Sequence, residues 1–440
     1  MRRSSLLVLG STVALAAALV AALVFAGGVG TAQAARTSAT TSSASSVSFL
    51  HSCGPAKAGF AACHAIVRVN GVKGNKGNPH QTPTPTSPTP TPTSGGGGGG
   101  STAVCTTNPG GGYTPCDLIS AYSLPSATAG SGQTVGIVDA YDDPNAESDL
   151  NTYRAAWGLS ACTTANGCFR KVNQSGGTSY PRTNGGWAQE ISLDLDMVSA
   201  ICPNCHILLV EASSSSLTNL GAAVNEAAAL GATEISNSYG GGESSSDTSY
   251  DTTYYHHPGI VITASTGDSG YGVEYPAASQ YVTAVGGTSL SKASNSRGWT
   301  ESAWNGAGSG CSADDPQPSW QSSVSNITAN CGNRANADVS SDADPNTGVD
   351  VYDSFAYQGL SGWLVFGGTS VSSPTIASVY ALAGNASSVN FASYPYSHTS
   401  SLNDVTSGSN GNCGGTDLCT AGTGWDGPTG LGTPNGTGGF

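Results

Sequence analysis

Hydrophobic and polar positions in the larger, C-terminal part of the chain form two alternating kinds of segment. Short apolar, β-branched runs, which favour buried parallel strands, lie at 134–141, 206–212, 232–240, 259–267 and 281–287. Longer stretches that favour helices lie between or after them, at 188–201, 217–231 and 372–384. Alternation of this kind predicts an α/β domain of three layers, in which helices flank a mostly parallel central sheet.

Polar residues follow several of the predicted strands. Asp139, Ser238 and Asp268 stand at or just beyond strand ends, and Ser370 precedes the helix at 372–384. Open α/β sheets bind ligands at the carboxyl ends of their strands. We therefore expect these four positions to gather at one edge of the sheet.

The extreme N-terminus has the pattern of an export signal. Arg2 and Arg3 precede a long apolar run and a small-residue A-x-A site at 32–34, so residues 1–35 are predicted to be a signal peptide. An uncleaved membrane anchor is the alternative, because the apolar run is just long enough to span a bilayer. We expect cleavage, and a secreted, extracellular protein without membrane attachment.

A biased stretch divides the rest of the chain. Pro and Thr alternate over 79–94 and six glycines follow at 95–100, which predicts a linker over 79–103. It separates a short segment, 36–78, from one large domain, 104–440. The segment is too short to bury much core alone, so we expect a remnant propeptide or a tethered tail.

Charge narrows the possible partners. The chain has 14 Lys and Arg against 28 Asp and Glu, a formal net charge of −14. This argues against nucleic acid as a partner, because nucleic acid binding needs clustered basic residues. Only 10% of residues are charged, so few paired carboxylates would be lost on acidification. The composition therefore predicts tolerance of low pH.

Twelve cysteines fall in close sequential pairs, an arrangement typical of short disulfide loops in an oxidising compartment. The pairs are Cys53/Cys63, Cys105/Cys116, Cys162/Cys168, Cys202/Cys205, Cys311/Cys331 and Cys413/Cys419. The Cys202/Cys205 pair, beside His206, also resembles a redox motif or half of a zinc site. No second CxxC accompanies it, so a structural disulfide is the preferred interpretation.

The stretch "GGTSVSSP" around Ser370 can present a hydroxyl at a helix N-terminus. A serine nucleophile needs a base, usually histidine, and none of the seven histidines lies in a setting like "HGTH". Glu190 and Asp194 are four residues apart, so on a helix they share one face. A carboxyl pair that shares a proton could act as the base in acid, where histidine is protonated. The alternative is a solvated acidic helix face, which Asp196 favours.

Asp268 lies between small residues in "STGDSGYG". A carboxylic acid that stays protonated can donate a hydrogen bond to a developing oxyanion. An Asx turn explains the same stretch equally well, so this residue decides nothing alone.

Together, "QEISLDL", "STGDSGYG" and "GGTSVSSP", in this order, resemble the sedolisin family of serine-carboxyl peptidases over about 113–433. The resemblance implies a subtilisin-like fold with Ser370 as nucleophile. It implies that Glu190 is the general base and acid, oriented by Asp194. It also implies that Asp268 stabilises the oxyanion.

The resemblance further implies one structural Ca²⁺ near the C-terminus. The residues that match the family's site are Asp404, Val405, Gly422, Gly424 and Asp426. Carboxylates and backbone carbonyls supply the hard oxygen ligands that Ca²⁺ prefers. Without the resemblance, a Gly-rich surface turn would explain the same residues.

Two features depart from the family pattern. Asp139 and Tyr239 stand where some members carry an acid and a tryptophan that extend the proton network, and whether they do so here is left open. The N-terminal segment is also much shorter than the usual folded prodomain, so self-cleavage is an open question.

These observations predict a secreted, acid-acting serine-type endopeptidase that cleaves protein or peptide substrates through an acyl-enzyme, and we expect a monomer. A catalytically inactive adhesion domain, held on the Pro/Thr- and Gly-rich stretch, is one alternative. A two-carboxylate glycosidase is another, but carboxyls on adjacent turns of one helix do not obviously flank a sugar bond.

Overall fold

The computed structural model describes residues 47–69 and 102–440, all within one compact unit, Ser45–Phe440. The predicted signal peptide and nearly all of the predicted linker lie outside these residues. In the ranges described, every helix is too short or too polar to cross a bilayer.

Within residues 102–440, eight strands form the central sheet in the order β12–β11–β9–β7–β4–β6–β5, and β15 also pairs with β11. All neighbouring pairs are parallel except β11–β12. The strands are β4 (Thr134–Ala140), β5 (Phe169–Asn173), β6 (His206–Ala212), β7 (Glu234–Asn237), β9 (Val261–Ser265), β11 (Thr283–Lys292), β12 (Trp299–Ala303) and β15 (Val339–Asp342).

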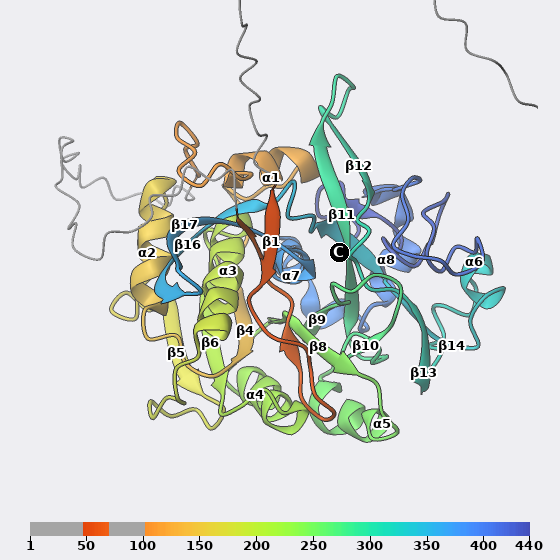
Figure 1. The fold of residues 1–440 in the computed structure, drawn as a ribbon, viewed down its shortest axis with the longest axis horizontal. Helices are drawn as coiled ribbons and strands as arrows, with labels where there is room; N and C mark the ends of the chain where they lie inside the picture. Colours follow the sequence, from red (N-terminus) through yellow and green to blue (C-terminus); the bar gives the residue numbers. More distant parts are fainter. Residues whose placement is uncertain (1–46, 70–101) are drawn as a thin grey trace, which may run out of the picture. The chain divides into compact units, whose positions relative to one another are not determined.

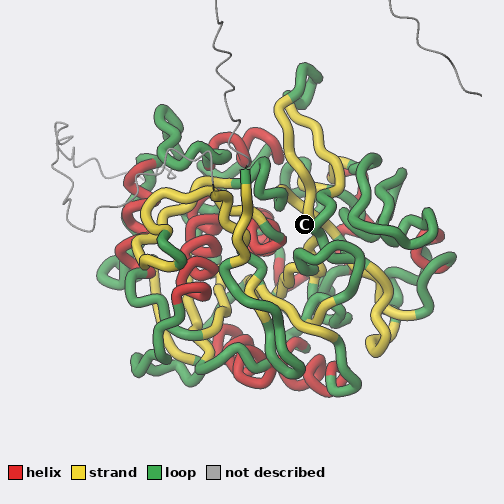
Figure 2. Tube along the Cα trace, viewed as in Figure 1, coloured by secondary structure: helices red, strands yellow, loops and turns green. Residues whose placement is uncertain are grey.

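Helices cover both faces of this sheet (Figures 1 and 2). The longest are α3 (Gly185–Ile201), α4 (Leu217–Ala229) and α7 (Thr369–Ala383). α3 and α7 pack on each other and belong to one hydrophobic core, whereas α4 belongs to a second. The remaining helices are α1 (Pro115–Tyr122), α2 (Ala146–Ala156), α5 (Asp247–Tyr250), η1 (Asp251–Tyr255), α6 (Ser325–Thr328), η2 (Ala386–Ser388), α8 (Ser393–Ser397) and η3 (Thr399–Ser401).

Alternation along β6 explains why the sheet is buried on both faces. Ile207 and Leu209 pack into the core that contains α3 and α7, while Leu208 and Val210 pack into the core that contains α4. Successive strand residues point to opposite faces, so a continuous apolar run is what a doubly covered strand requires. The predicted three-layer α/β fold is confirmed.

Smaller sheets surround the central one. They contain the hairpin β16 (Val349–Tyr357) and β17 (Leu360–Gly367), β8 (Tyr239–Gly242) with β10 (Glu274–Tyr275), β13 (Gly310–Pro316) with β14 (Asn333–Asn336), and β18 (Leu402–Asn403) with β19 (Thr433–Pro434).

The described part of the N-terminal segment pairs with two of these sheets. It contains β1 (Ser48–His51), β2 (Ala62–Cys63) and β3 (Ile66–Val69). β1 and β3 extend the β16–β17 hairpin into a four-stranded sheet, and β2 adds to the edge of β8. The segment therefore packs with the large domain through backbone pairing, which differs from the tethered tail considered from the sequence.

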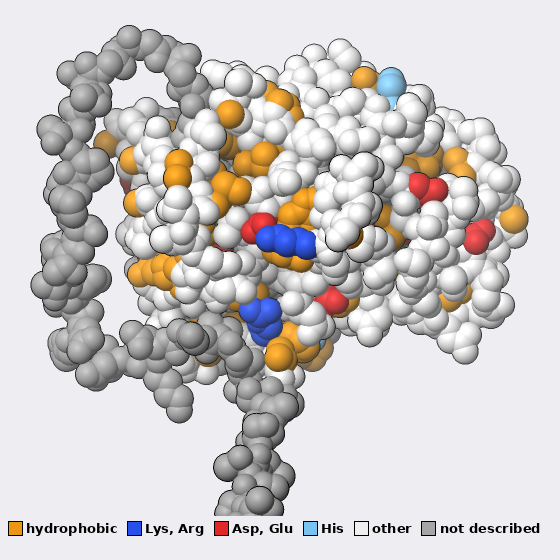
Figure 3. Space-filling model, turned by 90° about the horizontal axis from the view of Figure 1, so that it is seen from above, with side chains coloured by type: hydrophobic (Ala, Val, Ile, Leu, Met, Phe, Trp, Pro, Cys, Tyr) orange, Lys and Arg blue, Asp and Glu red, His pale blue; other side chains and the backbone are white. Residues whose placement is uncertain are grey.

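All twelve cysteines pair as the spacing predicts. Cys202 and Cys205 form one of these disulfides and are both buried, in line with the structural interpretation of the CxxC stretch. The face seen in Figure 3 carries few charged side chains among uncharged polar surface, in line with the low charged fraction of the sequence.

Candidate active site

Ser370 is the second residue of α7 and follows directly on β17 through a glycine turn. Gly368 has φ +100°, which favours glycine. The side chain of Ser370 is fully buried, and its Oγ donates to the carbonyl oxygen of Ser238 over 3.4 Å. Pro374 has no N–H for the carbonyl of Ser370, and this carbonyl oxygen instead lies 3.5 Å from Ser238 Oγ. Contacts with Ser238 thus hold Ser370, in the first turn of α7, next to the end of β7.

Glu190 and Asp194 lie on α3, four residues apart, and both side chains are fully buried. α3 begins where Asn184 accepts hydrogen bonds from the backbone N–H groups of Gly186 and Trp187, a common helix N-cap. Asp196 is buried as well, so the interpretation of α3 as a solvated acidic face is wrong.

Burial is the main reason that the pKa of Glu190 lies well above its ordinary value, and the charge of Asp194 adds to it. The nearby Ser370 hydroxyl acts in the opposite direction and lowers the pKa of Glu190. The pKa of Asp194 is raised by burial and by Asp139, although Ser238 Oγ donates to its Oδ1 over 2.8 Å. Carboxyls in this setting share protons, because two adjacent buried charges are unfavourable.

Asp139, at the end of β4, belongs to the same buried cluster. Burial raises the pKa of Asp139 well above its ordinary value, with further contributions from Glu190 and Glu211. The hydroxyl of Tyr239 instead donates to Oδ1 of Asn237 over 2.7 Å. Of the two residues left open by the sequence, the structure brings Asp139 into the carboxyl cluster and directs the Tyr239 hydroxyl elsewhere.

Asp268 lies just beyond β9. Its Oδ1 accepts hydrogen bonds from the N–H and the hydroxyl of Thr369, each 2.8 Å long. These partners belong to the residue before Ser370, so the side chain does not form the local Asx turn considered from the sequence. Its Oδ2 is buried without a hydrogen-bond partner. Burial raises the pKa of Asp268 to about 6, so this carboxyl is protonated in acid and can donate.

The five predicted calcium residues also come together. Gly424 N–H donates to Oδ2 of Asp404 over 3.0 Å, and Gly422 N–H donates to Oδ2 of Asp426 over 3.1 Å. Val405 is buried beside Asp404 in the chain. Burial raises the pKa of Asp426 to about 7, and the charge of Asp404 contributes.

Two neighbouring carboxyls, Asp404 just after β18 and Asp426 in the Gly-rich turn, fit a hard cation, whose charge would relieve their repulsion. In the ranges described, no group of three or more His, Cys, Asp or Glu side chains could hold a metal ion. A calcium ion at this turn would therefore need backbone carbonyl ligands as well.

Comparison with known proteins places the chain in a family. The Subtilase family model matches residues 132–396, more than half of the chain, so the chain belongs to the subtilase family. Within that family, the resemblance to sedolisins seen in the sequence is confirmed by two relatives and by a solved structure.

Kumamolisin from Bacillus sp. (strain MN-32) is 32% identical over 74% of this chain and 62% of its own length. Sedolisin from Pseudomonas sp. (strain 101) is 30% identical over 73% of this chain and 60% of its own length. The chain thus spans about 60% of the length of these relatives. A solved structure of Pseudomonas sedolisin, a serine-carboxyl proteinase bound to pseudo-iodotyrostatin, is 28% identical with a TM-score of 0.61, covering 74% of this chain and 95% of that one.

Some residues at the site carried little or no sequence signal. Ser238 was expected only to lie at the sheet edge, yet it contacts both Asp194 and Ser370. The backbone N–H of Ala65 donates to Oε2 of Glu190 over 2.8 Å. In the N-terminal segment that contains Ala65, the spacing of Cys53 and Cys63 was the sequence feature that indicated a defined structure. It did not indicate where the segment packs.

Proposed function

We propose that the protein is a secreted, acid-acting serine endopeptidase. The observation that carries this proposal is the fully buried Glu190–Asp194 pair on α3, which packs against α7, the helix that carries Ser370. A carboxyl pair that shares one proton keeps one carboxylate that can accept a proton in acid, where imidazole is already protonated. Named relatives that are peptidases support the same reaction class.

In the proposed reaction, Ser370 Oγ attacks the carbonyl carbon of a peptide bond and gives its proton to Glu190. Asp194 holds Glu190 by sharing a proton with it. Asp268, protonated below about pH 6, donates a hydrogen bond to the carbonyl oxygen as it becomes negative. Glu190 then passes the proton to the leaving nitrogen, the C–N bond breaks, and water hydrolyses the remaining ester by the same groups in reverse.

We also propose one structural Ca²⁺, held by Asp404 and Asp426 together with backbone carbonyl groups around Val405, Gly422 and Gly424. When bound, the ion would fix the C-terminal turn by neutralising two adjacent carboxylates.

Secretion is supported by the signal-like N-terminus and by the pairing of all twelve cysteines in disulfides. Disulfides persist in oxidising compartments.

The test compares two serines of the same helix. Ser370→Ala should abolish hydrolysis of denatured protein at pH 3–5. Ser378→Ala should leave it unchanged, because the Ser378 hydroxyl is buried on α7 without a hydrogen-bond partner. A Ser370→Ala protein as active as the wild type would refute the proposal, because another group would then carry out the hydrolysis.

A further inference from the structure

Glu211 is a charged residue near the end of the otherwise apolar, buried strand β6. Its side chain is fully buried, and burying a carboxyl is unfavourable unless its oxygens are bound. The backbone N–H of Asp143 donates to its Oε1 over 3.0 Å. Its Oε2 is buried as well and has no hydrogen-bond partner among the described residues. One oxygen of Glu211 is therefore bound, and the other is open.

The ammonium group of Lys171, on β5, fixes the bound oxygen. Its Nζ lies 2.9 Å from Oε1 of Glu211, 2.6 Å from Oδ1 of Asp142 and 2.6 Å from the carbonyl oxygen of Asp143. An ammonium group has three N–H donors, so these three acceptors use all of them. Two donors thus meet at Oε1 of Glu211, and a proton on this carboxyl has to lie on Oε2.

Glu211 carries that proton throughout the acid range. Burial raises the pKa of Glu211 to about 8, although the charge of Lys171 acts to lower it. Below this pKa the carboxyl is neutral and can donate one hydrogen bond. In acid, Glu211 is therefore a donor through Oε2.

The residue opposite Glu211 in the sheet is Asp139. The two are register partners on the parallel strands β6 and β4, and neighbouring strands lie about 4.8 Å apart. They follow Leu209 and Ile137 by two positions, so both side chains point to the face that packs on α3 and α7. Asp139 is fully buried, and neither of its oxygens has a partner in the described part of the chain. A protonated Glu211 thus faces an open acceptor.

Open oxygens continue from Asp139 to the candidate catalytic pair. Oδ2 of Asp194 and Oε1 of Glu190 have no hydrogen-bond partner within the described ranges. Their other oxygens are bound, because Oδ1 of Asp194 accepts from Ser238 and Oε2 of Glu190 accepts from Ala65. Asp139 acts on the pKa of Asp194, and Asp194 acts on that of Glu190. The four carboxyls form a row in which each has an oxygen available for a shared proton.

We propose that Glu211 is a positioning residue: held by the Lys171 ammonium group, it donates a hydrogen bond to Asp139 and so orients the protons of the row. Asp139 then donates to Asp194, and Asp194 donates to Glu190. Three protons occupy four carboxyls, and the negative charge stays on Glu190. The row becomes neutral when Glu190 takes the serine proton, and it regains its charge when Glu190 passes that proton to the leaving nitrogen.

This inference rests on the function proposed above. It adds the group that decides which carboxyl of the row is ionised and ready to act as the base. It also extends the row beyond Asp139, to a glutamate and a lysine that belong to two further strands of the central sheet.

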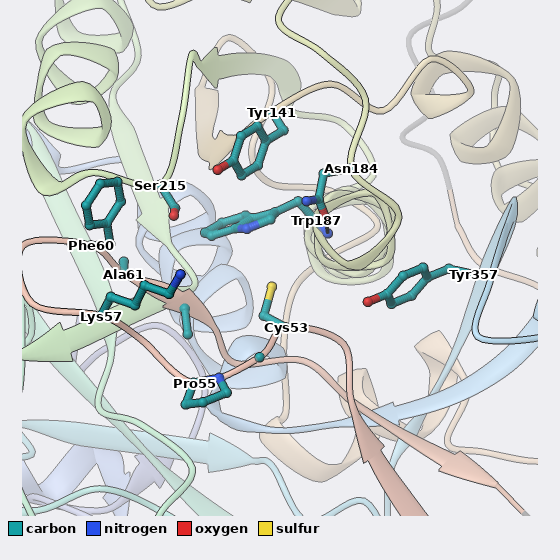
Figure 4. A pocket seen from close by; sticks show the side chains of 12 residues that line it. Cys53, Pro55, Lys57, Phe60, Ala61, Tyr141, Asn184, Trp187, Ser215 and Tyr357 are labelled. Atoms are coloured by element: carbon teal, nitrogen blue, oxygen red, sulfur yellow. Dashed lines mark hydrogen bonds between the residues drawn. The ribbon is translucent and has the colours of Figure 1, made fainter.

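The two ends of the row lie at different cavities. Figure 4 shows Trp187, three residues before Glu190 on α3, in a cavity of about 420 Å³ that Tyr141 and the N-terminal segment also line. Lys171 lines another cavity, of about 280 Å³, and among the described residues the two cavities share no lining side chain. A change at Glu211 leaves the residues around the larger cavity in place, so its effect is expected on kcat rather than on KM.

The first test compares two replacements of Glu211 in peptide hydrolysis from pH 2 to pH 7. Glu211→Met removes the donor and should lower kcat at pH 4 by about tenfold to 100-fold, with KM within about twofold. Without the donor the row holds its charge less well, so the acid limb of kcat/KM should move up by about one pH unit. Glu211→Gln should rescue both values, because the two donors at Oε1 select the amide oxygen and leave the NH₂ group to donate to Asp139.

The matched control is Glu234→Met. Glu234 is equally buried, also has a pKa raised to about 8 and also has one unpaired oxygen among the described residues. It lies on β7, the other neighbour of β4, but near Val135 instead of Asp139. Glu234→Met should change the unfolding temperature and leave kcat and the acid limb unchanged.

These variants give outcomes that separate the inference from the proposed function. If Ser370→Ala is inactive and Glu211→Met keeps the wild-type kcat and acid limb, the inference is overturned and the proposed function stands. If Glu211→Gln is as impaired as Glu211→Met, the donor role is overturned. If Ser370→Ala is as active as the wild type, the proposed function fails and the inference fails with it.

The second test needs no catalysis and does not depend on the folding of the Met variant. Infrared spectra at about pH 6, below the pKa of Glu211 of about 8, detect the C=O band of a protonated carboxyl. The wild type should show one such band that Glu211→Gln lacks. Identical carboxylic acid bands in the two proteins would show that Glu211 is ionised and cannot donate, which would overturn the inference.

Discussion

The backbone N–H of Ala65 donates a 2.8 Å hydrogen bond to Oε2 of Glu190. In a peptidase, the group that meets the amide nitrogen of a bound peptide is the group that protonates it as it leaves. Glu190 is also fully buried on α3, which packs against α7, the helix that carries Ser370. One buried carboxyl thus meets a peptide nitrogen beside the helix of the candidate nucleophile, and the predictions below follow from that position.

Replacing Glu190 by Gln should remove the proton carrier and keep the shape of the site. We expect kcat on a peptide substrate to fall by about 10³-fold at pH 4, with KM changed little. The variant should unfold at a temperature no lower than the wild type, because it no longer buries an ionisable group. Steady-state kinetics and thermal unfolding on one preparation give both values. A variant within about tenfold of wild-type kcat would argue against Glu190 as the base.

Asp268 should limit activity at the upper end of the pH range. Its pKa of about 6 means that it is neutral and can donate below that value, and is charged and repels an oxyanion above it. Asp268→Ala should lower kcat by about 10²-fold to 10³-fold. Asp268→Asn, which donates at every pH, should retain more activity and lose the decline near pH 6. A decline unchanged in Asp268→Asn would show that another group titrates there.

Buried carboxyls should make the protein more stable in acid than at neutral pH. Burial raises the pKa of Asp143 to about 7 and the pKa values of Glu234 and Asp353 to about 8. Their ordinary values, taken for the unfolded chain, are 3.8 and 4.5. Between these limits the folded state binds more protons, so stability is full below about pH 4 and is lost as pH rises through 7–8.

The check on this prediction is thermal unfolding across pH. We expect the unfolding temperature to fall by about 5 °C or more from pH 4 to pH 8. An unfolding temperature that rises over this interval would contradict the assignment.

Removing calcium should destabilise the C-terminal turn. A chelator should lower the unfolding temperature of the wild type by several degrees, since an ion bound only to the folded state stabilises it. The unfolding temperature of Asp404→Ala should be lower than that of the wild type without chelator, and adding the chelator should not change it. Asp314→Asn, which changes an acid elsewhere on the domain, should respond as the wild type does. Identical thermal unfolding curves of the wild type with and without chelator would contradict the proposed calcium site.

The sequence predicted the central fold because each strand and helix carries its own local pattern. The apolar run at 206–212 matches β6, and the run at 134–141 matches β4 to within one residue. The run at 232–240 was expected to be one strand, but Ser238 leaves the sheet between β7 and β8. That break is what directs Ser238 toward the carboxyl pair.

Other features depend on contacts that a local pattern does not contain. Asp196 favoured the alternative of a solvated helix face, but β16 covers α3 and the N–H of Tyr352 donates to Asp196 Oδ2 over 2.9 Å. The course of residues 47–69 is set by pairing with β8 and β17, which lie far along the chain. Its strands are two to four residues long, so they gave no periodicity to detect.

The proposed carboxyl base competes with one other group, because His64 is a histidine inside the site. The pH dependence of kcat/KM for a small peptide, measured from pH 2 to pH 8, separates the two most directly. A carboxyl base predicts a maximum in acid, with activity still near its maximum at pH 4 and a decline above about pH 6. An imidazole base predicts the reverse, with a rate that falls about tenfold for each unit below pH 6.5. That second profile would contradict the account.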